Sequence, residues 1–320
     1  MLFYLPVKGE RCQHCRAKTC LTVKPFDIRN IFTRRNRTLP SKIGRFWTTH
    51  PQYGYRAFSW DSCESRDPLV LVYNRIPKAG SSTVITLMKK LSSVNEFQLS
   101  TPQSHNYEAV RLEIFKALET KKRTLIINHV KFPEVFHDNQ VAYINIMRHP
   151  VDRCISWYYY SRYGHPLRHV ARQRYGTDTI DECVAKPAAE RQVCFNCHQE
   201  EQARYFCGRA DGSCRSASLE EIFRRARNNM DAHYFVGLTE RFEETMESLE
   251  NLYPTYFKGA RIVLNQMPPR NVGKNRSEYV LPSEESKNYI RDYSQQEIGL
   301  YDHAAQLFEK HRTKCMAEWQ

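Results

Sequence analysis

The sequence predicts an α/β fold in which a mostly parallel β-sheet carries helices on both faces. Four short, continuous runs of apolar residues are typical of strands that are buried on both sides. These runs span residues 69–73, 125–127, 141–147 and 234–238. Helical patterns separate them, beginning with apolar residues at spacings of three and four from Val84 to Leu91. Strands that alternate with helices in this way form parallel sheets.

Helix-starting residues support the remaining elements. Pro150 follows the third strand and suits the first turn of a helix. Residues 218–221 form a capping box, which begins a helix towards Met230. Apolar spacing predicts two more helices, one over residues 242–252 and a long one from about 283 to about 311.

Charge divides the chain into two parts. The 320 residues carry a formal net charge of +13, but residues 11–60 hold eleven lysines and arginines against one acid, Asp27. Residues 61–320 are nearly balanced, at +3. We therefore separate a basic N-terminal extension, residues 1–66, from a globular domain, residues 67–320. Anion binding by that domain must come from local clusters of cations, because its net charge is small.

The cysteine content indicates disulfide bonding in a secretory compartment. Eleven cysteines are present, an odd number that leaves at least one outside intrachain pairs. Four fall within one short stretch: Cys183, Cys194, Cys207 and Cys214. Two sequons, at Asn36 and Asn275, are candidate glycosylation sites that fit the same compartment. No run approaches the ~18 apolar residues of a membrane span, and the opening segment is too short for a signal peptide.

Three polar segments each follow a predicted strand. They span residues 74–83, 128–131 and 148–156. Ligands of open α/β sheets bind beyond the carboxyl ends of the strands. We therefore expect the three segments to meet in space, although they are far apart in the sequence.

The first of these segments has the composition of a phosphate-binding loop. It joins a strand to a helix through Lys78, Ala79 and Gly80 and then three hydroxyl residues, Ser81, Ser82 and Thr83. Small residues let backbone N–H groups approach an anion, and the N-terminus of the helix adds partial positive charge. A simple helix cap remains the alternative. The lysine precedes the glycine, so the segment is not a Walker A loop.

The third segment places Arg148 at a strand end and Ser156 two turns into the next helix. Together they can grip one phosphate through a charge-assisted hydrogen bond and a hydroxyl donor. The alternative is structural: Arg148 would pair with Asp152, and Ser156 would be a small packing residue.

Several of these motifs, in this order, resemble the uronosyl 2-O-sulfotransferase family. The likeness begins with residues 73–82 (YNRIPKAGSS), 146–153 (IMRHPVDR) and 156–160 (SWYYY). It continues through the motifs at 205–208 (YFCG) and 235–240 (FVGLTE) and covers about residues 67–311. The family includes enzymes that act on heparan sulfate, enzymes that act on chondroitin and dermatan sulfate, and the insect Pipe-like proteins.

The resemblance implies a P-loop-like sulfotransferase fold for residues 67–320. It also implies 3'-phosphoadenosine 5'-phosphosulfate (PAPS) as the sulfuryl donor, with no metal. Residues 78–83 would bind the 5'-phosphosulfate, Arg148 and Ser156 the 3'-phosphate, and Lys274 would belong to a loop that closes over the nucleotide. The implied disulfides are Cys183–Cys194 and Cys207–Cys214.

His129 is the candidate general base. Transfer to an alcohol requires removal of the hydroxyl proton, and a histidine with a pKa of ~6.5 suits that task. His129 follows a predicted strand closely, and the matching histidine in the family is the catalytic base; Lys78 would act beside it on the leaving oxygen. A buried structural histidine is the alternative, and His149 is the reserve candidate. Heparan-sulfate-acting members resemble His-x-His here, whereas this chain has Ile127, which favours a uronyl-type or Pipe-like acceptor.

The acceptor is expected to be an acidic glycan held by arginines. Guanidinium groups match carboxylates and sulfates in a bidentate geometry. Four arginines follow the third strand and its helix, and the family suggests a fifth beside the first loop: Arg162, Arg168, Arg172, Arg174 and Arg75. A solvated basic surface is the alternative. The resemblance places the protein in the Golgi lumen or membrane and leaves homo-oligomerisation open.

Two other functions compete with this interpretation. The basic extension, with aromatic residues between Phe46 and Trp60, suits a non-catalytic polyanion-binding protein, with nucleic acid as the less favoured partner. Cys12, Cys15 and Cys20 resemble part of a zinc site, but no second pair follows at a matching distance.

Overall fold

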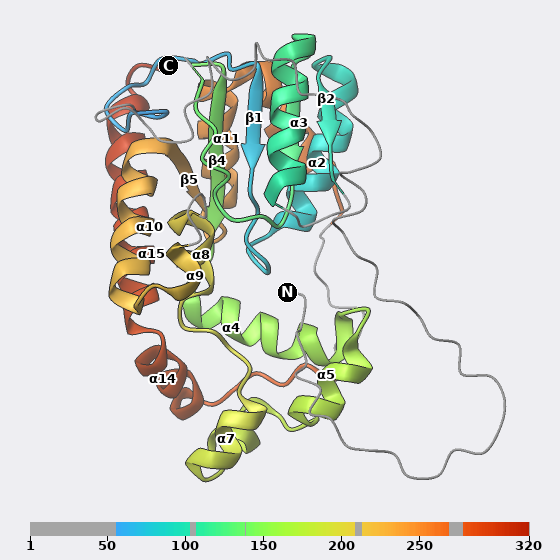
Figure 1. Cartoon of the computed structure of the whole chain (residues 1–320), viewed down its shortest axis with the longest axis vertical. Coiled ribbons are helices and arrows are strands. Elements are labelled where there is room, and N and C mark those ends of the chain that lie inside the picture. Colours follow the sequence, from blue (N-terminus) through green and yellow to red (C-terminus); the bar gives the residue numbers. More distant parts are fainter. Residues whose placement is uncertain (1–55, 103–106, 138, 209–212, 269–277, 320) are drawn as a thin grey trace, which may run out of the picture. The chain divides into compact units, whose positions relative to one another are not determined.

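Five parallel strands form the sheet at the centre of the computed structural model (Figure 1). In spatial order they are β2 (Gln98–Ser100), β3 (Thr124–Ile127), β1 (Val70–Tyr73), β4 (Val141–Met147) and β5 (Tyr234–Leu238). The four predicted strands are confirmed, and each is buried along its whole length. The edge strand β2 is missing from the sequence-based prediction because its three residues stay exposed or half-buried.

The structure describes residues 56–102, 107–137, 139–208, 213–268 and 278–319, all within the unit formed by residues 47–320. Most of the sequence-defined extension, residues 1–55, lies outside these ranges. Its last residues, 56–66, bring Phe58 and Cys63 into buried positions in the domain. Within the described ranges, no helix combines the length and apolar character needed to cross a membrane.

The register of the sheet brings three strand ends together. β1 lies between β3 and β4, with Tyr73 opposite Ile127 on one side and opposite Ile144 on the other. β4 continues beyond this level to Met147, where it pairs with Leu238 of β5. The segments that follow β3, β1 and β4 therefore leave the same edge of the sheet as neighbours.

Helices cover both faces of the sheet. α3 packs over β1 and β3, while α2, α11, α12 and α13 contact one another on the opposite face (Figure 1). The helices on the sheet and near it are α2 (Ser81–Val94), α3 (Tyr107–Thr120), α8 (Glu201–Cys207), α9 (Ser213–Ser216), α10 (Leu219–His233), α11 (Phe242–Leu252), α12 (Pro254–Phe257), α13 (Ala260–Asn265) and α15 (Gln295–Cys315).

A second group of helices forms a lobe beyond the carboxyl ends of the strands (Figure 1). It consists of α4 (Pro150–Tyr159), the π-helix η2 (Tyr160–Gly164), α5 (Arg168–Tyr175), α6 (Ile180–Val184), α7 (Ala188–Cys194) and α14 (Glu284–Tyr293). This helical lobe has its own apolar cluster, built around Ile155, Tyr158, Ile180 and Ile290. The lobe and the sheet therefore have separate cores joined through α4.

The prediction of one long final helix over residues 283–311 is wrong. The chain leaves helical geometry at Ser294 and forms α14 and α15 on either side of it. Ile290 of α14 packs in the cluster of the helical lobe, whereas Phe308 of α15 packs in the main core, where its ring contacts that of Phe235 in β5. The break lets two apolar faces point into two different cores.

Four disulfides connect the described cysteines: Cys63–Cys315, Cys154–Cys197, Cys183–Cys194 and Cys207–Cys214. The last two are the pairs that the family resemblance implied. Cys154–Cys197 and Cys183–Cys194 both lie in the helical lobe. Cys63–Cys315 joins residues that are 252 positions apart. The cysteines at 12, 15 and 20 lie outside the described residues.

Arg162, expected from the sequence to bind the acceptor, is instead enclosed in the helical lobe. Its side chain is fully buried, and its guanidinium lies 3.6 Å from the centre of the Tyr158 ring. All five N–H groups of the guanidinium donate to protein oxygens. The acceptors are the carbonyl groups of Tyr158, Tyr175, Gly176 and Cys194 and the side chain of Asn196. No donor remains for an acceptor glycan, so Arg162 joins η2, α5 and α7.

We predict that Arg162→Met lowers the free energy of unfolding by at least about 3 kcal/mol. Each buried acceptor left without a donor costs about 1–3 kcal/mol, and four of the five acceptors lose theirs, since the Tyr158 carbonyl still accepts from the Ser161 hydroxyl. Arg172→Met, in the exposed helix α5, is the matched control and should change stability by no more than about 0.5 kcal/mol. Denaturant unfolding measures both variants, and equal effects would contradict the structural role of Arg162.

Candidate active site

The three polar segments meet at the carboxyl edge of the sheet, as expected. The Arg148 guanidinium, after β4, donates to the carbonyl oxygen of Lys78 at 3.2 Å. His129, after β3, places Nδ1 2.9 Å from the carbonyl oxygen of Arg75. The segment after β1 therefore contacts both of the other segments.

Buried asparagines fix the chain where the three segments leave β1, β3 and β4. Asn145 of β4 donates to the backbone carbonyl of Asn74 at 2.9 Å, and Asn74 donates to the carbonyl of Tyr205 at 2.9 Å. Neither asparagine side chain is exposed. Asn128 donates its backbone N–H to Tyr73 and its side-chain amide to Pro102. Because these polar groups are buried and paired, the loop ends have little freedom to move.

The loop between β1 and α2 has the backbone of an anion cradle. Lys78 and Gly80 both adopt positive φ angles, 68° and 75°. Glycine takes this conformation easily, but at lysine it carries strain, and such strain is concentrated at functional sites. α2 starts at Ser81 without a side-chain cap on its first turn. Its first N–H groups are therefore not capped by a side chain, and the helix dipole favours an anion beside them.

Three cationic side chains, those of Arg75, Lys78 and Arg148, gather around this loop. Among the described residues, no acidic side chain forms an ion pair with Arg75, Lys78 or Arg148. Burial, with the nearby charge of Arg148, lowers the pKa of Lys78 to about 8. Burial also lowers the pKa of Arg75, whose buried Nε–H has no hydrogen-bond partner among the residues that the structure describes. An anion placed here would relieve both the repulsion and the desolvation.

Tyr160 is a residue of this site that sequence reasoning missed. Its ring lies 4.0 Å from the ammonium nitrogen of Lys78, a cation–π contact. Tyr160 begins the π-helix η2, and π-helical turns are frequent at functional sites. A Cβ atom at Gly164 would come within 2.7 Å of the Tyr160 ring, so glycine leaves the space that this ring occupies. The π-helical turn has no signature in the sequence from which it could have been predicted.

The hydrogen bond of His129 determines its tautomer. A carbonyl oxygen only accepts hydrogen bonds, so Nδ1 of His129 carries the proton that bonds to Arg75. In the neutral ring, the lone pair then lies on Nε2. A histidine oriented in this way is suited to accept a proton through Nε2.

The remaining predicted residues divide into two groups. Ala79 is buried in the loop, Ser81, Ser82 and Thr83 form the first turn of α2, and Ser156 is half-buried on α4. Arg168, Arg172 and Arg174 are exposed on α5. The reserve histidine, His149, packs its ring against Tyr301, while its backbone N–H donates to Glu240. Lys274, Asn36 and Asn275 lie outside the described residues.

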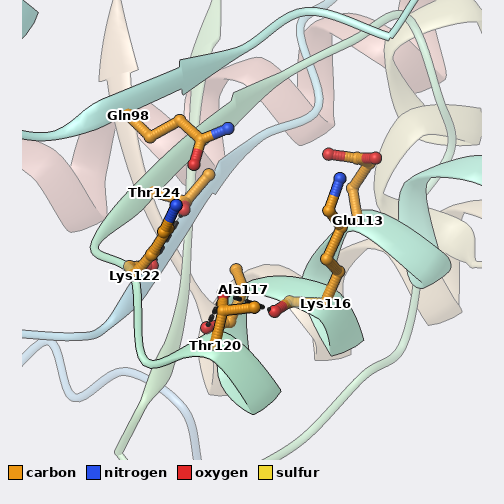
Figure 2. A pocket seen from close by; sticks show the side chains of 7 residues that line it. All are labelled: Gln98, Glu113, Lys116, Ala117, Thr120, Lys122 and Thr124. Carbon is orange, nitrogen blue, oxygen red and sulfur yellow. Dashed lines mark hydrogen bonds between the residues drawn. The ribbon is translucent and has the colours of Figure 1, made fainter.

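A shallow hollow lies at the opposite edge of the sheet (Figure 2). It is lined by Gln98, Glu113, Lys116, Ala117, Thr120, Lys122 and Thr124. Thr124 begins β3, whereas His129 follows its last residue, Ile127. The hollow is therefore separate from the site formed by Arg75, Lys78 and Arg148, which we call the cation-rich site.

Comparison with protein families agrees with this site. The model described as "Sulfotransferase family" matches residues 65–302. The chain belongs to the sulfotransferase family. The matched part of the chain includes β1 to β5 and every described residue of the cation-rich site.

Individual relatives carry more specific names. The chain is 30% identical to human uronyl 2-sulfotransferase over 75% of its own length and 63% of that protein. It is 28% identical to the Drosophila melanogaster heparin sulfate O-sulfotransferase, over 80% of this chain and 76% of the relative. A mouse sulfotransferase complexed with PAP is a distant structural likeness, with 13% identity, a TM-score of 0.38, and coverage of 78% of this chain and 91% of that one.

We predict that sulfate binding at the cation-rich site weakens as the pH rises above about 8. The anion favours protonated Lys78, whose pKa in the free protein is about 8. Below that pH the lysine is already charged, so affinity stays level; above it, affinity falls by up to about tenfold per pH unit. Sulfate suits the measurement because its own charge is constant over this range. Calorimetry from pH 6.5 to 9.5 reports the affinity.

Lys78→Arg is the control for this pH dependence, because a guanidinium does not titrate in that range. The variant should bind sulfate with an affinity that stays level from pH 6.5 to 9.5. A decline of the same steepness in both proteins would show that another group titrates.

Proposed function

We propose that the protein is a PAPS-dependent O-sulfotransferase that transfers a sulfuryl group to the 2-hydroxyl of a uronosyl residue in an acidic glycan. The observation that carries the proposal is the meeting of the Lys78 loop, His129 and Arg148 at one edge of the sheet. The chain spans 63% and 62% of the two uronyl 2-sulfotransferases that it matches, from human and mouse. Family membership and the names of the relatives support the reaction class.

The described residues fit a donor with anionic groups at two positions. The uncapped start of α2 and the Lys78 side chain suit the 5'-phosphosulfate, as the family resemblance implies. Arg148, with Ser156 on the following helix, suits the 3'-phosphate. Lys274 is proposed to close over the nucleotide. When bound, the donor supplies an activated sulfuryl group.

His129 and Lys78 divide the proton and charge transfer between them. Nε2 of His129 accepts the proton of the acceptor hydroxyl, while the Nδ1–H bond to Arg75 keeps the ring oriented. The ammonium of Lys78 stabilises the negative charge that develops on the leaving oxygen. Tyr160 holds that ammonium in the site by its cation–π contact.

The acceptor is proposed to lie along α5. Arg168, Arg172 and Arg174 are exposed there and can bind carboxylates or sulfates. Arg75, beside the phosphate-binding loop, is proposed to contact the acceptor as well. Its guanidinium donates to the hydroxyl of Ser81 at the start of α2. Ile127 occupies the end of β3 with 2% of its surface exposed, in place of the first histidine of the His-x-His pattern. The missing histidine favours a uronyl-type or Pipe-like acceptor over heparan sulfate.

The cellular setting follows from the same family. We propose a location in the Golgi lumen or membrane, and the four disulfides support an oxidising compartment. Glycosylation at Asn36 and Asn275 and homo-oligomerisation remain part of the proposal.

Transfer of radiolabelled sulfate from PAPS tests the proposed reaction. The acceptor panel contains dermatan, chondroitin and heparan sulfate chains and glycoproteins. We expect incorporation at uronosyl 2-hydroxyls of dermatan or chondroitin sulfate, or into a glycoprotein glycan, and at least about tenfold less into heparan sulfate. Preference for heparan sulfate would overturn the acceptor assignment. PAPS binding without transfer to any member would favour a non-catalytic polyanion-binding protein.

We predict that His129→Ala lowers kcat by at least about 100-fold, since general-base catalysis contributes typically 10²–10⁴-fold. PAP affinity should stay within about twofold, because the imidazole is proposed to act on the acceptor hydroxyl, and its Nδ1 contacts the carbonyl of Arg75, a proposed acceptor ligand. His149→Ala is the matched comparison. If only His149→Ala abolished turnover, the base would be His149.

A further inference from the structure

The backbone of Arg148 has an unusual partner. Arg148 follows the last paired residue of β4, Met147, and precedes α4, which begins at Pro150. Its N–H donates to Oε1 of Gln202 at 3.0 Å, and its carbonyl accepts from Nε2 of Gln202 at 2.8 Å. One carboxamide therefore bonds both backbone groups, as a neighbouring strand would.

Gln202 is itself held from the opposite side. It lies on α8 with no exposed surface, and its own backbone N–H donates to Oε1 of Glu297 on α15. The carboxylate of Glu297 is 1% exposed and lies 3.7 Å from the guanidinium of Arg153 on α4. The chain of contacts returns to the helix that begins just after Arg148.

Burial of the Glu297–Arg153 pair has an unfavourable desolvation free energy, which suggests a role in fixing the positions of these two residues. Oε2 of Glu297 and Nε of Arg153 both lack hydrogen-bond partners among the described residues. Burial raises the pKa of Glu297 to about 7, although the charge of Arg153 opposes the shift. Buried ion pairs contribute little net stability, so their value lies more in fixing a geometry.

From these contacts we propose that Gln202 is a positioning residue for the donor site, held by Glu297, which fixes the backbone of Arg148 so that its guanidinium reaches the Lys78 loop. The proposal rests on the proposed function, in which Arg148 binds the 3'-phosphate. It assigns a role to α8 and α15, neither of which contributes a side chain to the predicted site.

Loss of Gln202 is expected to weaken binding of the 3'-phosphate and not of the 5'-group. If the backbone of Arg148 turns, its guanidinium moves away from the 3'-phosphate and from the carbonyl of Lys78. The start of α2, which suits the 5'-group, has no contact with Gln202 in its capping interactions. Loss of Gln202 should therefore affect ligands that carry a 3'-phosphate and spare those that lack it.

Binding of PAP and of adenosine 5'-monophosphate to Gln202→Met tests the inference. Methionine has nearly the same volume but forms neither hydrogen bond to Arg148. We expect PAP affinity to fall by about tenfold or more, while affinity for adenosine 5'-monophosphate stays within about twofold. In Arg148→Ala, the added Gln202→Met change should weaken PAP binding no further, because the two residues act through one contact.

Asn229→Leu is the matched control. The amide of Asn229 also bonds two backbone carbonyls at α8, those of Phe206 and Cys207 at its C-terminal end. Its loss should lower the unfolding temperature while leaving the ratio of the two affinities unchanged. If Gln202→Met does not fold, Gln202→Asn replaces it, since the shorter amide cannot bond both groups of Arg148 at once.

The outcomes separate the two proposals. Equal weakening of both ligands, or an additive loss in the double variant, would mean that Gln202 serves only general stability, and would overturn the inference alone. Wild-type protein that does not prefer PAP over adenosine 5'-monophosphate would overturn the assignment of Arg148 to the 3'-phosphate, and the inference with it.

Discussion

Two cationic side chains, Lys78 and Arg148, are held at one sheet edge, and no carboxylate in the described part of the chain forms an ion pair with either of them. Much of the structure serves that arrangement. Their repulsion and desolvation are unfavourable, as the lowered pKa of Lys78 indicates. The surrounding contacts offset this cost. Buried asparagines fix the strand ends, and Gln202 fixes the backbone of Arg148. The ring of Tyr160 forms a cation–π contact with the ammonium group of Lys78. Such a site is prepared for an anion before the anion arrives.

The parts of the molecule that sequence alone predicts are those determined by local pattern. β1, β3, β4 and β5 are buried along their length, so each is a continuous apolar run that is hard to mistake. Parallel strands place their carboxyl ends at one edge, which is why Lys78, His129 and Arg148 could be assigned to one site. The two cysteine pairs came from the family resemblance, not from spacing.

The parts that escaped prediction depend on contacts between distant residues. Arginine is a residue type that binds acidic glycans, so the sequence favoured that role for Arg162. Its five hydrogen-bond acceptors, however, lie up to 34 positions away and are brought together only in the folded helical lobe. The bond from Gln202 to Arg148 spans 54 positions, and that from Gln202 to Glu297 spans 95. The break at Ser294 could not be predicted from the local sequence either. It depends on the tertiary structure, because the residues before and after it pack in different cores.

The Cys63–Cys315 bond makes the ends of the domain interdependent. It joins a segment that the charge pattern assigned to the extension to the last turn of α15, beside the buried ring of His311. In the denatured chain it would close a loop of about 250 residues, which removes conformational freedom worth several kcal/mol in the chain-entropy model. A recombinant protein begun at residue 67 would therefore lack both this covalent tie and the ring of Trp60, and would carry Cys315 as an unpaired thiol beside His311, whose ring contacts Trp319.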